Sequence, residues 1–210
     1  MTVIVLAIEF GADELHTAAR IAEELGFALV DLRKFELEMA EHCDLVGSQD
    51  RRPIDGWAAF SGRWRISSAQ LAHRLAEEIL DRASHGNIVI TSWCAPALLS
   101  GLDHTIRVLL TAPQPDRDAR IMRHRGYCDR RTACIDREYV DALVGRHARR
   151  VVNADWRDSA FFNASVVLQQ GRHADVVNEL RNWAKCDEFQ ETPGARASFE
   201  SHIDAARRMH

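Results

Sequence analysis

The sequence predicts one α/β domain, a three-layer α/β/α sandwich around a five-stranded parallel sheet. Three observations support this prediction. Short, wholly apolar runs such as Val3–Ile8 are typical of parallel strands that are buried on both faces. The stretches between them place apolar residues three and four positions apart, which indicates amphipathic helices. Each run but the last is followed by helical material long enough to connect parallel strands.

The first β-α-β unit occupies residues 1–31. Apolar steps from Leu15 to Leu25 predict a helix, and Gly26 stands where a left-handed cap belongs. Residues 27–31 then form a second short strand. Such a unit usually opens a nucleotide-binding α/β domain. Its first turn, residues 9–14, takes the place of a phosphate-binding loop, although it has one glycine, two acids and no lysine.

The later elements follow the same alternation. Further strands are predicted at 87–91, 105–111 and 164–168, and helices at 33–43, 67–86, 92–102, 115–124, 132–150 and 173–184. Residues 44–67 mix tryptophans with arginines, which can stack on a base and hold a phosphate. We favour the alternative, a loop or short helical arm that folds its tryptophans onto the body.

The domain is expected to span residues 1–186, with a helical lid at about 125–157. Residues 187–210 form a polar tail with one short amphipathic segment, marked by Phe199 and Ile203. That segment could dock on the body, mediate a homodimer or bind a protein partner, or stay loose.

Composition narrows the function classes. A net charge of -4 and a pI near 6.2 argue against a nucleic-acid partner, although local arginine clusters keep a nucleic-acid-binding module as a third hypothesis. No apolar run approaches the roughly twenty residues that a membrane span needs, and no basic leader precedes the first strand, so we expect a cytoplasmic protein. Five scattered cysteines suit reduced thiols, and the ten histidines show no metal-ligand spacing, so no metal site is predicted.

Several segments together carry a family resemblance. They are Ile8-Glu9-Phe10-Gly11, Ile21-Ala22-Glu23-Glu24-Leu25-Gly26, Val30-Asp31-Leu32-Arg33, residues 106–113 with Asp116-Arg117, and Asp155-Trp156-Arg157-Asp158. In order and spacing they resemble the P-loop nucleoside monophosphate kinase fold and, in more detail, the cytidylate kinase-like family. The resemblance spans about residues 3–185 and leaves the tail uncovered.

The resemblance implies transfer of a phosphoryl group from ATP to a nucleoside monophosphate, with Mg²⁺ bridging the phosphates. Backbone N–H groups at a helix N-terminus would hold the donor, and lid arginines would neutralise the transferred group. By this resemblance the cofactor-binding residues are Phe10, Gly11, Ala12, Asp13, Glu14 and Leu15. The substrate-binding residues are Asp31, Arg33 and Arg117, and the catalytic residues are Arg146, Arg149 and Arg150.

The sequence departs from the family pattern where charge matters most. The position of the Walker lysine is Glu14, and Asp13 replaces a loop glycine. Like charges about 4 Å apart repel by about 4 kcal/mol at an effective dielectric of 20, so the two acids oppose a polyanion. In the lid, the family's D-R-R-R becomes Asp141-Ala142-Leu143-Val144, and only a shift of register would let Asp136-Arg137-Glu138 replace it.

Each of these residues also has a purely structural interpretation. Asp13 and Glu14 lie in the first helical turn, where acids stabilise the helix dipole, and we prefer this role for them. Asp31 can cap the following helix beside a surface arginine, and helical arginines are commonly a solvated face. We therefore expect a nucleotide phosphotransferase fold with weak or no kinase activity. The alternative is a pseudokinase that acts as a regulatory ligand-binding or protein-interaction module.

Overall fold

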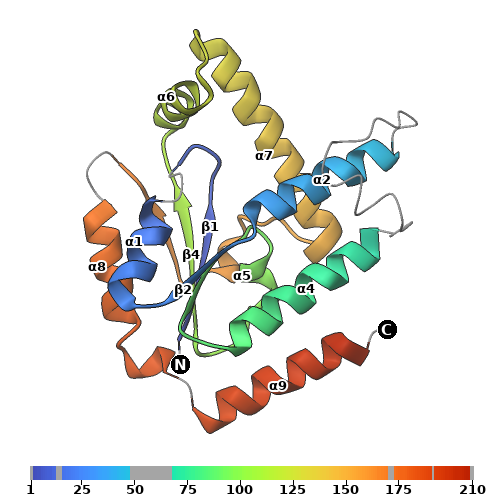
Figure 1. The fold of residues 1–210 in the computed structure, drawn as a ribbon, viewed down its shortest axis with the longest axis vertical. Helices are drawn as coiled ribbons and strands as arrows, with labels where there is room; N and C mark the ends of the chain where they lie inside the picture. The colour runs from blue at the N-terminus through green and yellow to red at the C-terminus, as the bar shows by residue number, and fades with distance from the viewer. Residues whose placement is uncertain (1, 13–15, 48–67, 170–172, 191, 209–210) are drawn as a thin grey trace.

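The computed structural model describes residues 2–12, 16–47, 68–169, 173–190 and 192–208 (Figure 1). The strands are β1 (Val3–Ile8), β2 (Ala28–Asp31), β3 (Ile88–Thr91), β4 (Thr105–Thr111) and β5 (Ala164–Val167). The α-helices are α1 (His16–Leu25), α2 (Arg33–Gly47), α4 (Ser68–Ser84), α5 (Ala95–Leu98), α6 (Gln114–Arg125), α7 (Arg130–Val152), α8 (His173–Trp183) and α9 (Pro193–Arg208). Two short 3-10 helices are η1 (Ser159–Phe161) and η2 (Asp187–Phe189). Most of the predicted tryptophan-rich arm, residues 48–67, lies outside the described residues.

The sheet is parallel throughout, with strand order β2-β3-β1-β4-β5. β1 lies at its centre with every residue buried, because both of its faces are covered by helices. The order reverses at β1, which pairs with β3 on one side and β4 on the other. In such sheets the carboxyl ends of the strands beside the switch point form the usual ligand crevice. The predicted fold class is confirmed.

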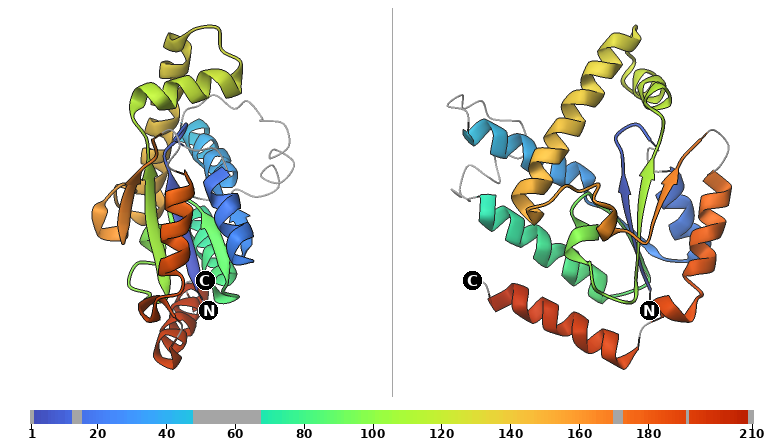
Figure 2. Two further views of the ribbon diagram at one scale, coloured as in Figure 1. Left: turned by 90° about the vertical axis from the view of Figure 1, so that its left-hand side faces the viewer. Right: turned by 180° about the vertical axis from the view of Figure 1, so that it is seen from behind.

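Two core clusters make the three layers (Figures 1 and 2). Val3, Val5 and Ala7 pack with α2, α4, α5 and α7 on one face of the sheet. Ile4, Leu6 and Ile8 pack with α1 and α8 on the other. Alternate residues of one strand therefore serve different layers, as the twofold repeat of a strand requires.

At the carboxyl end of the strands, α6 and α7 project beyond the sheet (Figure 2), and we call these two helices the lid; α7 lies within the predicted range of about 125–157. Gly126 ends α6 with φ of 70°, and the carboxylate of Asp129 caps α7 by accepting from Thr132 N at 2.9 Å. That cap explains why α7 begins at Arg130, two residues before the predicted start.

At the opposite end of the sheet, α9 packs along α4. Its Phe199 is buried and lies 5.3 Å, centroid to centroid, from the ring of His104. Thr2 Oγ1 also donates to the carbonyl of Phe189 at 3.2 Å, so the segment after α8 closes over the start of β1. Of the three arrangements left open for the tail, the structure shows docking on the body. Among the helices that the structure describes, none combines the length and apolarity that a membrane crossing requires.

Candidate functional site

The loop that leaves β1 is tightly bound to α6. Gly11 has φ of +77°, and a Cβ atom there would lie 2.8 Å from Ile121 Cγ1 and 3.0 Å from the carbonyl oxygen of Arg117. Glycine is required at this position both for its left-handed backbone and for the close approach of the helix. The N–H of Ala12 donates to the carbonyl of Glu9 at 2.8 Å, which closes a turn. Three of the predicted loop residues, Asp13, Glu14 and Leu15, lie outside the described residues.

Arg117 of α6 holds that loop in place. Its side chain is only 3% exposed. Nε donates to the carbonyl of Phe10 at 2.7 Å, and Nη2 donates to Asp141 Oδ1 at 2.6 Å. Nη1 lies 3.5 Å from Glu9 Oε2. The guanidinium therefore binds the loop through Phe10, the acid before the loop, Glu9, and the lid helix α7 through Asp141.

A second arginine binds the same two acids. Arg157 Nε lies 3.0 Å from Glu9 Oε1, and Nη2 lies 3.5 Å from Asp141 Oδ2. Its guanidinium also stacks 4.2 Å above the Trp156 ring. We call Glu9, Arg117, Asp141 and Arg157 the arginine–acid network. It joins the end of β1, α6, α7 and the segment after α7, and its formal charges cancel.

Further arginines bind the loop to α6 and bind α6 to α7. Arg120 donates to the carbonyls of Gly11, at 3.3 Å, and of Ala12. Arg137 is almost fully buried and donates to Asp118 at 2.6 Å. The loop therefore presents carbonyl oxygens to α6, and Arg117 and Arg120 of that helix donate to them.

The three predicted catalytic arginines lie farther along the lid helix. Arg146 is half-buried, whereas Arg149 and Arg150 are exposed. At about 1.5 Å of rise per residue, the last two stand about 12 to 14 Å beyond Asp141 along the axis of α7. Helix α7 packs against α2 and α4. Arg117, by contrast, is the predicted substrate residue that the structure brings to the loop.

Asp31 and Arg33 meet at the carboxyl end of β2, and we call them the strand-end pair. Arg33 Nε and Nη2 donate to the two oxygens of Asp31 at 3.0 and 2.8 Å. Thr91 Oγ1, at the end of the neighbouring β3, donates to the same carboxylate at 2.6 Å. Burial alone would raise the pKa of Asp31, but the hydrogen bonds from Arg33 and Thr91 outweigh it and lower that pKa.

Glu36 of α2 was not predicted as a site residue. Its side chain is fully buried and accepts from Ser92 Oγ, from Trp93 N at 2.8 Å and from Cys94 N at 3.4 Å. Burial raises its pKa from 4.5 to about 7, although these donors favour the charged form. A signal was present in the sequence, because Glu36 lies four residues after Leu32 and three before Met39, on the apolar face of its helix.

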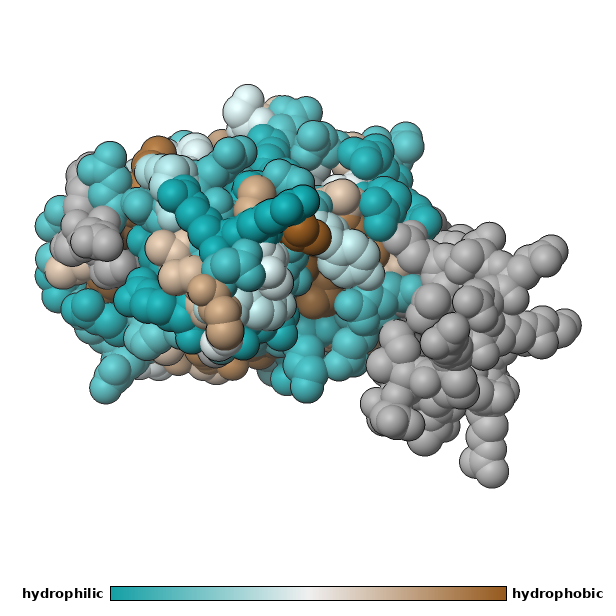
Figure 3. All heavy atoms as spheres, turned by 90° about the horizontal axis from the view of Figure 1, so that it is seen from above, coloured by the Kyte–Doolittle hydropathy of each residue, from teal (hydrophilic) through white to brown (hydrophobic). Residues whose placement is uncertain are grey.

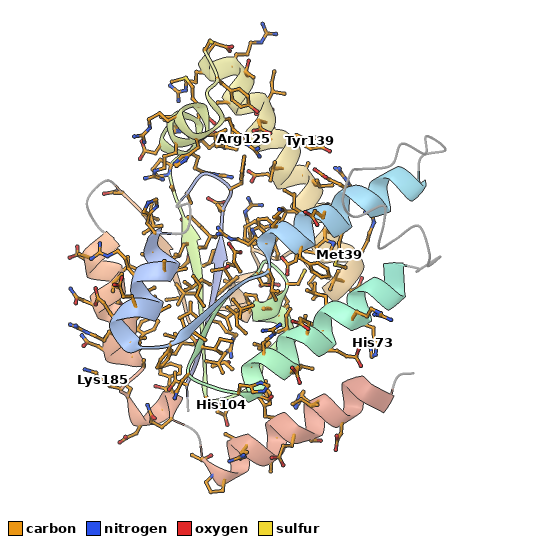
Figure 4. The ribbon with its side chains drawn as sticks, viewed as in Figure 1. Met39, His73, His104, Arg125, Tyr139 and Lys185 are labelled. Carbon is orange, nitrogen blue, oxygen red and sulfur yellow. The ribbon has the colours of Figure 1, made fainter. Side chains whose placement is uncertain are left out.

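Seen from the lid end, the described surface is mainly hydrophilic, with isolated apolar side chains (Figure 3). Arg125 lies at this end and His104 at the other end of the sheet (Figure 4). The Arg125 guanidinium carbon lies 5.9 Å from the centre of the Phe10 ring, so the lid also covers the loop through an aromatic contact. The described part of the chain contains no group of three or more His, Cys, Asp or Glu side chains placed to hold a metal ion.

The chain was compared with family models, with curated proteins and with solved structures. A sequence model of the cytidylate kinase-like family matches residues 3–169. No curated protein matches the chain. An uncharacterized protein from Eubacterium ventriosum has a similar crystal structure, with a TM-score of 0.63 and 18% identity over 87% of this chain and 97% of that one.

Two shikimate kinases are weaker structural matches. The enzyme from Acinetobacter baumannii, solved with shikimate, gives a TM-score of 0.46 and 12% identity over 87% of this chain and 92% of its own. The enzyme from Bacteroides thetaiotaomicron gives a TM-score of 0.48 and 13% identity over 88% of this chain and 99% of its own.

Proposed function

We infer a nucleotide kinase-like function, because the chain belongs to the cytidylate kinase-like family. We propose that it binds a nucleoside monophosphate or another phosphate-bearing small molecule at the carboxyl end of the sheet. We further propose that it transfers a phosphoryl group from ATP weakly or not at all. Both proposals rest on the residues around the loop after β1.

The observation that carries this proposal is the arginine–acid network. Catalysis of phosphoryl transfer depends on cations that neutralise the charge of the phosphates. Here Arg117 and Arg157 are both paired with Glu9 and Asp141, so an incoming phosphate would have to compete with two fixed carboxylates. This pairing supports the proposal that magnesium–ATP binds weakly, and Glu14 at the Walker lysine position adds a further acid in the sequence.

A second candidate function is that of a pseudokinase that senses a ligand or binds a protein. The strand-end pair favours it, because the hydrogen bonds among Asp31, Arg33 and Thr91 involve no residue of the loop after β1. An acceptor-side ligand could then bind without any transfer. A protein partner that uses the tail would meet the polar face of α9, since Ala195 and Phe199 are buried against the body.

A thermal-shift series with ATP, CMP and dCMP, each with and without Mg²⁺, tests these functions. A ligand present at one hundred times its dissociation constant stabilises a fold by about 2.7 kcal/mol, which is a rise of a few degrees. We expect a shift with a monophosphate and none with magnesium–ATP. A magnesium-dependent shift with ATP, followed by measurable turnover, would overturn the proposal.

Glu9→Gln sharpens this test. The substitution removes one of the two acids that hold Arg117 and Arg157, so it should strengthen the binding of ATP or inorganic phosphate relative to wild type. Glu23→Gln, on the exposed side of α1, is the matched control and should leave binding unchanged. Equal phosphate affinity in the wild type and the Glu9→Gln variant would show that the network does not block the site.

A further inference from the structure

The loop that follows β3 is organised around one buried carboxylate. Glu36 accepts from the hydroxyl of Ser92 and from the backbone N–H groups of Trp93 and Cys94. Ser92 Oγ in turn accepts from Cys94 N at 3.2 Å and from Ala95 N at 2.9 Å. The hydroxyl proton is thereby directed to the carboxylate, and four consecutive residues take their geometry from a side chain of α2.

The same loop is attached to the central strand. Trp93 Nε1 donates to the carbonyl of Ile8 at 2.9 Å, and Ser92 N donates to the carbonyl of Leu6 at 3.1 Å. Ile8 is the last residue of β1 and immediately precedes Glu9 of the arginine–acid network. On its other side the loop follows Thr91, which donates to Asp31 of the strand-end pair. Residues 92–95 thus connect the two parts of the candidate site.

We propose that Glu36 is a positioning residue that fixes residues 92–95 and, through the Trp93 indole, sets the strand-end pair and the loop after β1 in one geometry. Its role requires the ionised carboxylate, because each of its three neighbours is a donor. This inference extends the proposed function, since it assumes that both parts of the site serve one ligand. The contacts themselves do not depend on which ligand that is.

Few charged groups face Glu36. Asp31 lies near enough to raise the pKa of Glu36, and Arg33 holds Asp31 from the other side. The Cys94 thiol is buried beside the carboxylate, and this burial and the charge of Glu36 both raise the pKa of the thiol. With a pKa of about 7, Glu36 loses its charge under mildly acidic conditions, and the loop then loses its charge-assisted hydrogen bonds.

The test observes Trp93 in the ligand-free protein. The chain is labelled with 5-fluorotryptophan, the Trp93 signal is assigned with Trp93→Phe, and its ¹⁹F NMR shift is followed against pH. We expect one titration with a midpoint near pH 7 in wild type and none in Glu36→Gln. Glu38→Gln, on the same helix and paired at the surface with Lys34 at 4.0 Å, should titrate as wild type does.

Ser92→Ala keeps the test decisive if Glu36→Gln does not fold. Loss of one donor destabilises the carboxylate, so the midpoint of the Trp93 titration should move to higher pH. A Trp93 shift that does not change with pH in wild type, or that titrates equally in Glu36→Gln, would overturn the inference. Because no nucleotide is present, this result is independent of the thermal-shift series that tests the proposed function.

Discussion

The two halves of the candidate site are stabilised in opposite ways. The strand-end pair is local, with Asp31 and Arg33 two residues apart and one additional bond to Thr91. The arginine–acid network is long-range, and its Glu9 and Arg157 are 148 residues apart. The pair joins residues that are neighbours in the sequence, whereas the network forms only where β1, α6, α7 and the segment after α7 are packed together. The network therefore depends on the packing of the lid, and the bonds of the pair do not involve it.

Replacement of Arg117 by Met should give the largest effect. It removes the buried cation and leaves Glu9 and Asp141 with the partly exposed Arg157, and breaking a buried ion pair costs about 3–5 kcal/mol. Urea denaturation measures this loss. Arg123→Met on the same helix is the control and should stay within about 0.5 kcal/mol, because its side chain is exposed. Similar losses of unfolding free energy in the two variants would show that Arg117 contributes no more to stability than an exposed arginine does.

Two buried groups outside both halves, Glu36 of α2 and His147 of α7, should give the stability opposite dependences on pH. The pKa of Glu36 is raised from 4.5 to about 7, so its contribution to stability is present below pH 4.5 and is lost as pH rises through 7. Burial and nearby Arg150 lower the pKa of His147 in the lid helix from 6.5 to about 4, so its contribution is lost as pH falls from 6.5 through 4. Each contribution is about 3 kcal/mol, and between pH 4.5 and 6.5 the two oppose each other.

In wild type the opposite effects of Glu36 and His147 on the free energy of unfolding cancel between pH 4.5 and 6.5, and single variants should reveal each one. In Glu36→Gln the His147 titration is left alone, so the free energy of unfolding should rise from pH 4.5 to 6.5. In His147→Gln it should fall over the same range. Urea denaturation at several pH values measures both slopes. Slopes of the same sign in the two variants would contradict the assignment.

Gly11→Ala tests how closely the loop is held against the lid. Alanine at φ of +77° costs about 1–2 kcal/mol, and the crowding against Ile121 adds about 1–3 kcal/mol. Gly26→Ala is a matched control, because Gly26 has φ of +67° with nothing within 4 Å of the added methyl group. The difference between the two melting temperatures isolates the crowding. Equal losses would mean that α6 yields to the methyl group at no cost.

Arg33→Ala should have the smallest effect, below about 1 kcal/mol, because the strand-end pair is partly exposed. Its clear signature is the pKa of Asp31, which should rise once the Arg33 hydrogen bonds are lost. The ¹³C shift of the Asp31 carboxylate against pH measures that change. A lid-dependent result, such as an altered Arg117 network in this variant, would contradict the local character of the pair.

Sequence patterns predicted the elements that have local causes. The bounds of β1 and β4 match their predicted ranges, because β1 is a wholly apolar run buried on both faces and β4 is apolar apart from its two end threonines and Arg107. Gly26 adopts the left-handed cap that its place after Leu25 indicated. The start of α7 was misplaced by two residues, because Asp129 rather than a later residue provides the cap.

The candidate site was less predictable, because its contacts join distant segments. No local pattern pairs Arg117 with Asp141, 24 residues away, or Glu9 with Arg157. The sequence shows Arg117 on a basic helix face, a pattern equally typical of solvated arginines. Glu36 stands on the apolar face of its helix, which signals burial, but the sequence does not show its donors, because they lie 56 to 58 residues further along the chain.

The position of Phe199 has an evolutionary consequence. The family match ends at residue 169, yet Phe199 of α9 belongs to the same core cluster as Leu75 of α4 and Trp93. This last helix is therefore not a separable module that a lineage can gain or lose without cost. A relative that lacks it needs another cover for α4 and His104. Across an alignment, the residues on the outer side of α4 should covary with the presence of α9.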